Sequence, residues 1–288
     1  MTLELRFWGT RGSIPSPGPQ TVRYGGNTPC VEVRDRNGHL AILDAGTGIR
    51  ALGNALLAGG ATSVSADVYV THAHWDHIQG LPFFAPLFHP GHSVRIWTAP
   101  ELGDRIERAL RAQMSPEVFP VPFEEMLAQV EFRALPGSAA AGEMCVTTHP
   151  VRHPGGALGY RLAGGNGWGG AVVYIPDNEL DPAAAYAAPP DWRARLVDFL
   201  HGADVLVHDA MYTAEEAAAH RGWGHSSALA AVELALEAGV RRLVLFHHHP
   251  ERSDDEVDAL LDVCRARAGR AGGALEVLAA AEGQQLIV

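Results

Sequence analysis

A short segment of the chain gathers four side chains that can bind metal ions. The sequence Thr-His-Ala-His-Trp-Asp-His-Ile-Gln-Gly places these four within six positions: His72, His74, Asp76 and His77. The apolar run Val68–Val70 comes directly before, which predicts a strand whose C-terminal end delivers the loop. A divalent ion needs several nitrogen and oxygen donors at about 2 Å. We therefore expect His72 and His74 to face one ion and Asp76 and His77 to face a second; histidines gathered by chance would rarely have this spacing.

Two kinds of element must position this loop. Short apolar runs bounded by glycine, proline or aspartate predict strands at Leu3–Trp8, Cys30–Val33, Leu40–Leu43, Val68–Val70, Val94–Thr98, Val130–Leu135, Met144–Thr148, Leu158–Leu162, Val172–Ile175, Val205–Val207, Leu243–Phe246 and Leu275–Ala279. Helical periodicity predicts helices at Ile49–Leu57, Leu102–Gln113, Arg193–His201, Ser227–Glu237 and Asp255–Ala268.

The order of these elements indicates the fold class. Strands dominate the first half while helices occur throughout, which favours an α/β (α+β) fold of two mixed sheets between helix layers. Ser253 and Glu256 have the spacing of a capping box, and Gly239 is a plausible helix stop. No internal repeat is evident. We interpret Ala139–Gly142 and Gly164–Gly170 as loops, and expect residues 1–288 to form a single domain.

Composition narrows the classes of partner. The formal net charge is −11, and all 22 basic residues are arginine. Tight nucleic-acid binding normally draws on a basic surface, so this balance disfavours a large nucleic-acid substrate. The three cysteines lie far apart, which argues against a zinc ribbon or a disulfide framework. The start of the chain has no apolar signal sequence, and no apolar run is long enough to span a membrane. We expect a cytoplasmic protein with no membrane partner.

The His-x-His-x-Asp-His loop after a strand resembles the signature of the metallo-β-lactamase superfamily. That resemblance implies an αββα sandwich with a dinuclear metal centre at one edge of the sheets. The third histidine of the family fits His153, just before Gly159-Tyr160, although His149 competes. The bridging carboxylate fits Asp177, after the run Val172–Ile175. The last histidine fits His247, after Leu243–Phe246, with His248 and His249 as the alternatives. We expect two divalent ions, zinc first, with manganese or iron(II) as alternatives.

Three further stretches resemble the opening of the phosphodiesterase branch, which contains ribonuclease Z and bacterial cyclic-phosphate phosphodiesterases. They are Gly9–Ser13, Tyr24–Cys30 and Leu43–Gly48. Glycine-rich turns let backbone amides approach an anionic phosphate closely, although most such turns are only tight connections. Asp44, in the third stretch, is expected to brace the metal loop by hydrogen bonding without binding metal.

A fourth stretch, Gly222-Trp223-Gly224-His225-Ser226-Ser227, resembles the His-Ser/Thr motif of the same branch. In that branch the histidine contacts the phosphate and does not bind metal, so the resemblance implies this role for His225. The alternative is that His225 is only part of the start of the following helix. Ser226 is expected to cap the helix, and Asp209 to orient His225 unless it is a surface carboxylate. Only 23 residues separate His153 from Asp177, which leaves no room for the tRNA-gripping arm of ribonuclease Z.

These features predict a metal-dependent hydrolase acting on a small, possibly cyclic, phosphodiester. The ions would activate a water molecule for attack on phosphorus. Asp76 would accept its proton, and His225 would stabilise the developing charge. The alternatives are a thioesterase of the glyoxalase II type, which would share the ligands, and a non-catalytic accessory or binding protein. A β-lactamase is disfavoured. The branch suggests a homodimer, for which the apolar stretch Phe83–Phe88 could be interface, pocket wall or core.

Overall fold

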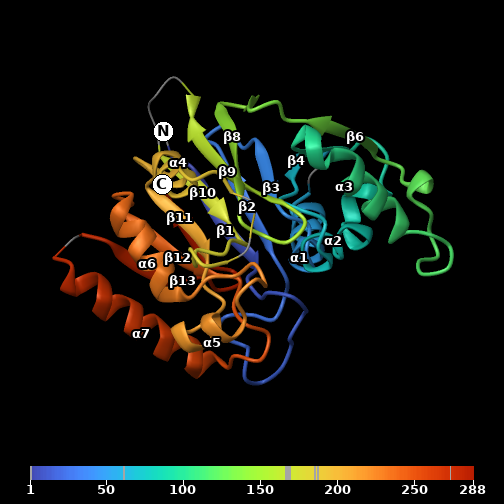
Figure 1. Ribbon diagram of the computed structural model, residues 1–288. Helices are drawn as coiled ribbons and strands as arrows, with labels where there is room; N and C mark the ends of the chain where they lie inside the picture. Colours follow the sequence, from blue (N-terminus) through green and yellow to red (C-terminus); the bar gives the residue numbers. More distant parts are fainter. Residues whose placement is uncertain (1, 61, 166–169, 185, 187, 273) are drawn as a thin grey trace.

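Two seven-stranded sheets form the centre of the computed structural model, which describes residues 2–60, 62–165, 170–184, 186, 188–272 and 274–288 (Figure 1). The first sheet has the order β14-β1-β2-β3-β4-β5-β6. Its strands are β1 (Glu4–Gly9), β2 (Cys30–Arg34), β3 (Leu40–Leu43), β4 (Ser65–Tyr69), β5 (Ser93–Thr98), β6 (Gln129–Ala134) and β14 (Gln285–Ile287).

The second sheet has the order β13-β12-β11-β10-β9-β8-β7. Its strands are β7 (Ser138–Ala141), β8 (Met144–Val151), β9 (Ala157–Gly164), β10 (Ala171–Ile175), β11 (Val205–Asp209), β12 (Arg242–Phe246) and β13 (Glu276–Ala279). Strands β10 to β13 are mutually parallel, whereas β7 to β10 pair in antiparallel fashion. In the first sheet, β14 to β3 pair in antiparallel fashion and β3 to β6 are parallel. Both sheets are therefore mixed, as the sequence predicts.

Helices cover the outer face of each sheet (Figure 1). The helices are α1 (Gly48–Ala58), α2 (Trp75–Ile78), α3 (Pro100–Ala112), α4 (Trp192–Leu200), α5 (Ala214–Ala219), α6 (Ala228–Glu237) and α7 (Asp254–Arg270). Short 3₁₀ turns add Leu81–Phe83, Ala85–Phe88 and Phe123–Glu125. Helices α1 and α3 pack on the first sheet, while α4, α6 and α7 pack on the second. The predicted sandwich of two sheets between helices is confirmed.

Apolar side chains from both sheets interlock between them. Phe7, Tyr69, Tyr160, Tyr174 and Phe246 are buried in this central cluster. This burial follows from the alternation of apolar residues in β1 and from the nearly continuous apolar runs of β10 to β12, which are covered on both faces. The core fixes the two sheets against each other, so loops at the ends of their strands are held at defined positions.

Several boundaries differ from the sequence prediction. The stretch Ala139–Gly142 is not a loop, because β7 pairs with β8 in the register Ser138↔Thr147 to Ala141↔Met144. An alanine run has low strand propensity, so pairing with β8 overrides local preference. Strand β14 and helices α2 and α5 were not predicted. Residues 166–169 of the predicted loop Gly164–Gly170 lie outside the described residues. The capping box of Ser253 with Glu256 is confirmed at the start of α7.

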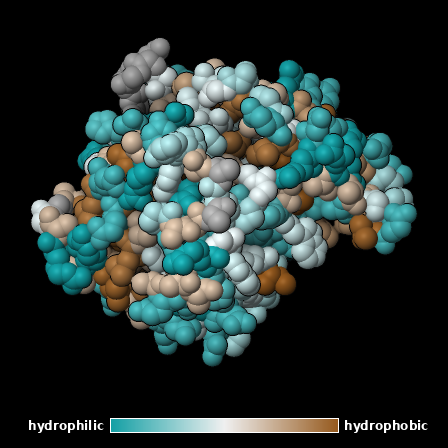
Figure 2. Space-filling model, viewed as in Figure 1, coloured by the Kyte–Doolittle hydropathy of each residue, from teal (hydrophilic) through white to brown (hydrophobic). Residues whose placement is uncertain are grey.

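The stretch Phe83–Phe88 is mostly core. Phe84 and Leu87 are buried against α1, while Phe83 stays exposed beside the ring of Phe119. The face of the molecule in Figure 2 is largely hydrophilic, with separate small hydrophobic patches. The homodimer stays a prediction. Among the described residues, no helix has both the length and the apolar character needed to cross a membrane.

Candidate metal centre

The predicted ligands converge at the C-terminal ends of the central strands. One group consists of His72, His74, His153 and Asp177, each of which offers an atom within 4.8 Å of the others. His72 and His74 come from the loop after β4, His153 follows β8, and Asp177 follows β10. The Nε2 atom of His153 lies 2.9 Å from Nδ1 of His74. Residues more than 100 positions apart thus form one compact donor set.

A second donor set lies beside the first. It consists of Asp76, His77 and His247, and it again meets the 4.8 Å limit. The Nε2 atom of His247 lies 3.0 Å from Oδ2 of Asp76, and Nε2 of His77 lies 3.3 Å from the same oxygen. The seven predicted ligands therefore divide into two neighbouring groups, as the loop spacing suggests.

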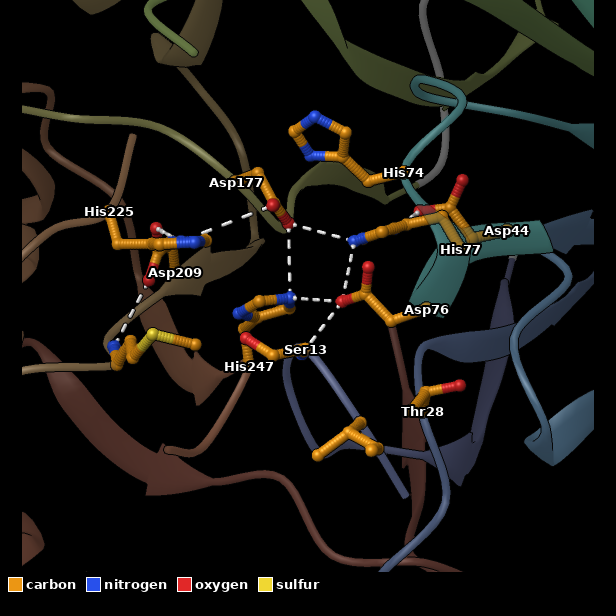
Figure 3. Close-up of polar contacts among 12 residues, drawn as sticks. Ser13, Thr28, Asp44, His74, Asp76, His77, Asp177, Asp209, His225 and His247 are labelled. Carbon is orange, nitrogen blue, oxygen red and sulfur yellow. Dashed lines mark hydrogen bonds and ion pairs between the residues drawn. The ribbon is translucent and has the colours of Figure 1, made fainter. Parts of the chain in front are cut away.

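Asp177 stands between the two donor sets (Figure 3). Its Oδ2 atom lies 3.7 Å from Nε2 of His72 and 3.5 Å from Nε2 of His153. Its Oδ1 atom lies 3.1 Å from Nε2 of His77 and 3.3 Å from Nε2 of His247. One oxygen faces each set, which is the geometry expected of a carboxylate that bridges two ions.

The donor atoms fit metal ions because several are buried without a hydrogen-bond partner. Among the described residues these include Nε2 of His72, Nε2 of His77 and Oδ1 of Asp177. A buried polar atom left unpaired costs about 1–3 kcal/mol, so a cluster of such atoms indicates that a ligand completes it. Nitrogen and carboxylate donors without sulfur suit zinc, manganese or iron.

The opposite nitrogens of three histidines are held by the protein. Nδ1 of His72 lies 3.0 Å from Oγ1 of Thr71, and Nδ1 of His153 lies 2.9 Å from the carbonyl oxygen of Gly224. Nδ1 of His77 donates to a carboxylate oxygen of Asp44 at 2.8 Å. Metal-binding histidines typically have such a partner, which fixes the ring and leaves the Nε2 lone pair facing the ion.

Asp44 is fully buried and connects several parts of the centre. Besides His77, its carboxylate accepts hydrogen bonds from the amide and hydroxyl of Thr71 and from the hydroxyl of Tyr174 at 2.9 Å. Its backbone adopts a positive φ of 60°, which aspartate tolerates better than most residues. The structure thus confirms the prediction that Asp44 supports the metal loop by hydrogen bonding.

The glycine-rich turns of the first part of the chain contact the metal loop. The backbone amide of Ser13 donates to Oδ2 of Asp76 at 2.8 Å. A Cβ atom at Gly12 would lie 2.4 Å from Nδ1 of His247, and one at Gly46 would lie 2.4 Å from the carbonyl oxygen of Asp76. Glycine at these positions allows the turns to pack tightly around the centre. Their approach to a phosphate remains a prediction.

His225 and Asp209 form a hydrogen-bonded pair beside Asp177 (Figure 3). Nδ1 of His225 lies 2.9 Å from Oδ2 of Asp209 and 4.0 Å from Oδ2 of Asp177. Asp209 is fully buried at the end of β11, so it is no surface carboxylate. Burial lowers the pKa of His225, but the carboxylates of Asp209, Asp177 and Asp76 outweigh it and raise that pKa to about 9. His225 thus carries a positive charge at neutral pH in the metal-free centre.

The competing histidines lie apart from the two donor sets. His149 stacks on Phe199 at 5.1 Å, on the outer side of the second sheet. His248 is buried and its Nε2 lies 2.8 Å from the carbonyl oxygen of Ala280, while His249 packs near the ring of Tyr212. His153 and His247 are therefore the histidines that reach the centre from these segments.

The helix cap after His225 differs from the prediction. Ser227, and not Ser226, caps α6 by accepting a hydrogen bond from the amide of Ala230. Ser226 is buried, and its hydroxyl donates to the carbonyl oxygen of Asn178. Ser226 therefore connects the loop after Asp177 with the segment that carries His225.

Glu179 is a buried residue that nothing in the sequence marks as functional. Its carboxylate accepts hydrogen bonds from the amides of Gly222 and Gly224 and from the hydroxyl of Tyr186. Gly224 has a φ of 90°, and a Cβ atom there would lie 2.2 Å from Nδ1 of His153. Glu179 thus holds a glycine turn that contacts His153. Only the two glycines around Trp223 hint at this turn in the sequence.

One side of the centre is open to solvent. His74 and Trp75 are exposed, whereas the other six predicted ligands are buried. A substrate can therefore approach along the side where His74 lies. The other ligands are buried, and burial lowers the local dielectric and strengthens electrostatic interactions inside the centre.

A two-sheet sandwich with a histidine and aspartate centre at one edge defines a protein of the metallo-β-lactamase fold. A family model described as "Beta-lactamase superfamily domain" matches residues 40–248, and the chain belongs to this superfamily. It is 26% identical to ribonuclease BN of Cronobacter sakazakii, over 92% of this chain and 95% of that protein.

Solved structures show the same fold. The metallo-beta-lactamase fold protein YhfI from Bacillus subtilis matches with a TM-score of 0.69 and 18% identity, covering 100% of both chains. A diphosphatase from the PhnP family matches with a TM-score of 0.66 and 20% identity, covering 99% of this chain and 97% of that one. The fold is thus shared over essentially the whole chain.

Proposed function

We propose that the protein is a dinuclear metal-dependent phosphodiesterase that acts on a small phosphodiester. The observation that carries this proposal is the position of Asp177, whose two oxygens face two separate donor sets while His225 lies 4.0 Å from the same carboxylate. A thioesterase of the glyoxalase II type would also need the two donor sets. It would leave the hydrogen-bonded pair of His225 and Asp209 without a role in catalysis.

We assign the metal-binding roles to the two donor sets described above. One ion would be held by His72, His74 and His153, the other by Asp76, His77 and His247, with Asp177 shared. Such ions, zinc first, would neutralise charge on a phosphoryl oxygen and lower the pKa of a water molecule. The carboxylate of Asp76 is held by the amide of Ser13, so it is positioned to accept a proton from the attacking water.

His225 would act on the phosphoryl group itself. A protonated imidazole at this position can stabilise negative charge or donate a proton to the leaving oxygen. Asp209 accepts the hydrogen bond from Nδ1, which leaves Nε2 free for the substrate. Asp209 is therefore a positioning residue that also favours the charged form of His225.

Two observations support a small substrate. The segment between His153 and Asp177 contains strands β9 and β10, which form an antiparallel pair, and only 23 residues in total. The net charge of −11 adds repulsion against a polyanion. The similarity to a protein named ribonuclease BN makes cleavage of RNA the second candidate, and the same centre would serve it. We also propose that residues 1–288 act as one domain, because both sheets supply ligands.

A direct assay tests the proposal. Protein loaded with zinc or manganese is incubated with bis(p-nitrophenyl) phosphate, a 2′,3′-cyclic nucleotide, a short RNA and an S-acyl glutathione. We expect metal-dependent turnover of the small phosphodiesters without thioester cleavage. Cleavage of the thioester alone would refute the proposal, and turnover of RNA alone would establish the second candidate. Failure on every substrate with two ions bound would favour an accessory protein.

A further inference from the structure

One buried asparagine connects most of the segments that carry the metal centre. Asn178 directly follows Asp177, and only 1% of its surface is exposed. An asparagine side chain has an acceptor oxygen and a donor NH₂ group, and both need partners when they are buried. The partners of Asn178 lie on segments distant in the sequence, and each of these segments contributes to the centre.

The two ends of the Asn178 side chain contact two different segments. Its Oδ1 atom accepts a hydrogen bond from the backbone amide of Arg152 at 3.0 Å, and Arg152 directly precedes the metal-binding candidate His153. Its Nδ2 atom lies 3.2 Å from Nε2 of His208, which is buried in β11. The side chain therefore joins the segment after β8 to strand β11.

A second contact of the His208 ring sets the direction of its bond with Asn178. Nδ1 of His208 lies 2.7 Å from the carbonyl oxygen of Asp209, and only a protonated Nδ1 can donate to that oxygen. Nε2 is then the acceptor, so the NH₂ group of Asn178 donates to it. Burial lowers the pKa of His208, which favours this neutral ring.

The backbone of Asn178 reaches the other half of the centre. Its amide donates to Oδ2 of Asp209 at 3.2 Å, and the same oxygen lies 2.9 Å from Nδ1 of His225 (Figure 3). Its carbonyl oxygen accepts a hydrogen bond from the hydroxyl of Ser226, the residue after His225. A shift of Asn178 would therefore move Asp177 relative to the pair of His225 and Asp209.

We propose that Asn178, with its partner His208, is a positioning residue that fixes Asp177 relative to the rest of the centre. The carboxylate of Asp177 faces both donor sets, so its displacement would disturb both ions at once. Loss of a residue that holds a metal ligand typically costs about 10–100-fold in metal affinity or activity. A misplacement of about 1 Å can cost about 10²-fold in rate. This inference rests on the proposed function only for its effect on turnover.

Zinc affinity tests the inference without a substrate. Asn178→Leu keeps the branching of the side chain and removes both of its hydrogen-bonding ends. We expect competition with a chromophoric chelator to show that both ions bind about 10–100-fold more weakly. The visible spectrum of the cobalt(II)-loaded protein should shift as well, because its bands depend on the arrangement of the donors. Unchanged zinc affinity and an unchanged cobalt spectrum would overturn the inference.

Variants of His208 separate the hydrogen bond from packing. His208→Leu removes the acceptor and should weaken zinc binding, whereas His208→Gln keeps an acceptor oxygen and should retain most of the affinity. The double variant Asn178→Leu/His208→Leu should bind zinc no more weakly than Asn178→Leu, because both changes remove the same hydrogen bond. Additive losses would refute the pairing. If Asn178→Leu does not fold, wild-type zinc affinity in His208→Leu overturns the inference on its own.

Leu180→Ala is the matched control for a loss of stability. Leu180 is buried two residues further along the same loop, where it packs in the apolar cluster that contains α4 and α6 residues. Its truncation should lower the melting temperature and leave zinc affinity at the wild-type value. The same behaviour in Asn178→Leu would limit Asn178 to a contribution to stability and refute the positioning role.

The outcome is separable from that of the proposed function. Turnover of bis(p-nitrophenyl) phosphate by the wild type, with unchanged zinc affinity and kcat in Asn178→Leu, would refute the positioning role alone. Weakened zinc binding in Asn178→Leu, in a protein whose wild type hydrolyses no phosphodiester, would refute the phosphodiesterase and retain the positioning role.

Discussion

The carboxylate of Asp44 lies 2.8 Å from Nδ1 of His77, on the side of the ring opposite the donor cluster. Both side chains are fully buried, so no water can replace this hydrogen bond. The carboxylate fixes the tautomer of His77 and holds its Nε2 atom beside Oδ2 of Asp76 and Oδ1 of Asp177, where a metal ion would bind. It also restrains Thr71, at the start of the metal loop.

Replacing Asp44 with Asn should therefore weaken metal binding. Loss of a carboxylate behind a metal-binding histidine typically lowers affinity by about 10–100-fold. Competition with a chromophoric zinc chelator measures the change. Tyr174→Phe is the matched control, because it removes one hydrogen bond to Asp44 and leaves His77 paired; it should change affinity far less. Equal affinities for wild-type and Asp44→Asn protein would contradict the role assigned to Asp44.

The local part of the site could be predicted from the sequence because four of its residues share one loop. His72, His74, Asp76 and His77 follow a strand with obvious apolar character, and their spacing limits where each can point. His153 and His247 required the family resemblance, since neighbouring histidines have the same residue type. Which histidine of each segment reaches the centre depends on how the chain packs after β8 and after β12, and the residue types alone do not show this.

Glu179 was beyond such reasoning for a physical reason. Its carboxylate accepts hydrogen bonds from backbone amides more than 40 positions away. Nearly every residue has such an amide, so the residue types do not show which amide will be the donor. Strand β7 could not be predicted from the sequence either. Its alanines have little strand propensity, and they form a strand because they pair with β8.

Removal of the His225 imidazole should slow catalysis without loss of metal. His225 lies beside the centre, and its Nδ1 is hydrogen-bonded to Asp209. His225→Ala should therefore lower kcat about 10²–10⁴-fold, as expected for loss of a general acid. Metal analysis should still find two ions per chain. Asp209→Asn should give a smaller loss of kcat with the same metal content. A metal-depleted His225→Ala protein would show that the histidine is structural.

Glu179→Gln should disturb the centre through the turn that precedes His225. Oε2 of Glu179 accepts from Gly222, Gly224 and Tyr186, and Oε1 accepts from Gly222 as well. An amide keeps only one of these oxygens and turns an NH₂ group toward the amide of Gly222 or toward all three donors. The carbonyl of Gly224 would then hold His153 less firmly, and we expect metal affinity and kcat to fall together. Tyr186→Phe leaves both glycine amides paired and should have little effect on either. A variant that lost thermal stability but kept metal affinity and kcat would limit Glu179 to a structural role.

The stability of the metal-free protein should fall with decreasing pH, in part because of His248. Burial lowers the pKa of His248 to about 3, whereas an unfolded histidine titrates near about 6.5. Below about pH 6.5 His248 binds a proton in the unfolded chain but stays neutral in the folded chain. Its contribution to the free energy of unfolding is therefore fully present above about pH 6.5 and is lost progressively toward pH 3. One such group contributes up to about 1.4 kcal/mol per pH unit. Urea unfolding of wild-type and His248→Gln protein between pH 7.5 and 4.5 measures this slope. In the variant the free energy of unfolding should change less with pH, by a slope that corresponds to at most one proton taken up on unfolding. This holds even if the variant is less stable at pH 7.5 because it loses the hydrogen bond to Ala280. Identical slopes would mean that His248 takes up its proton in the folded state.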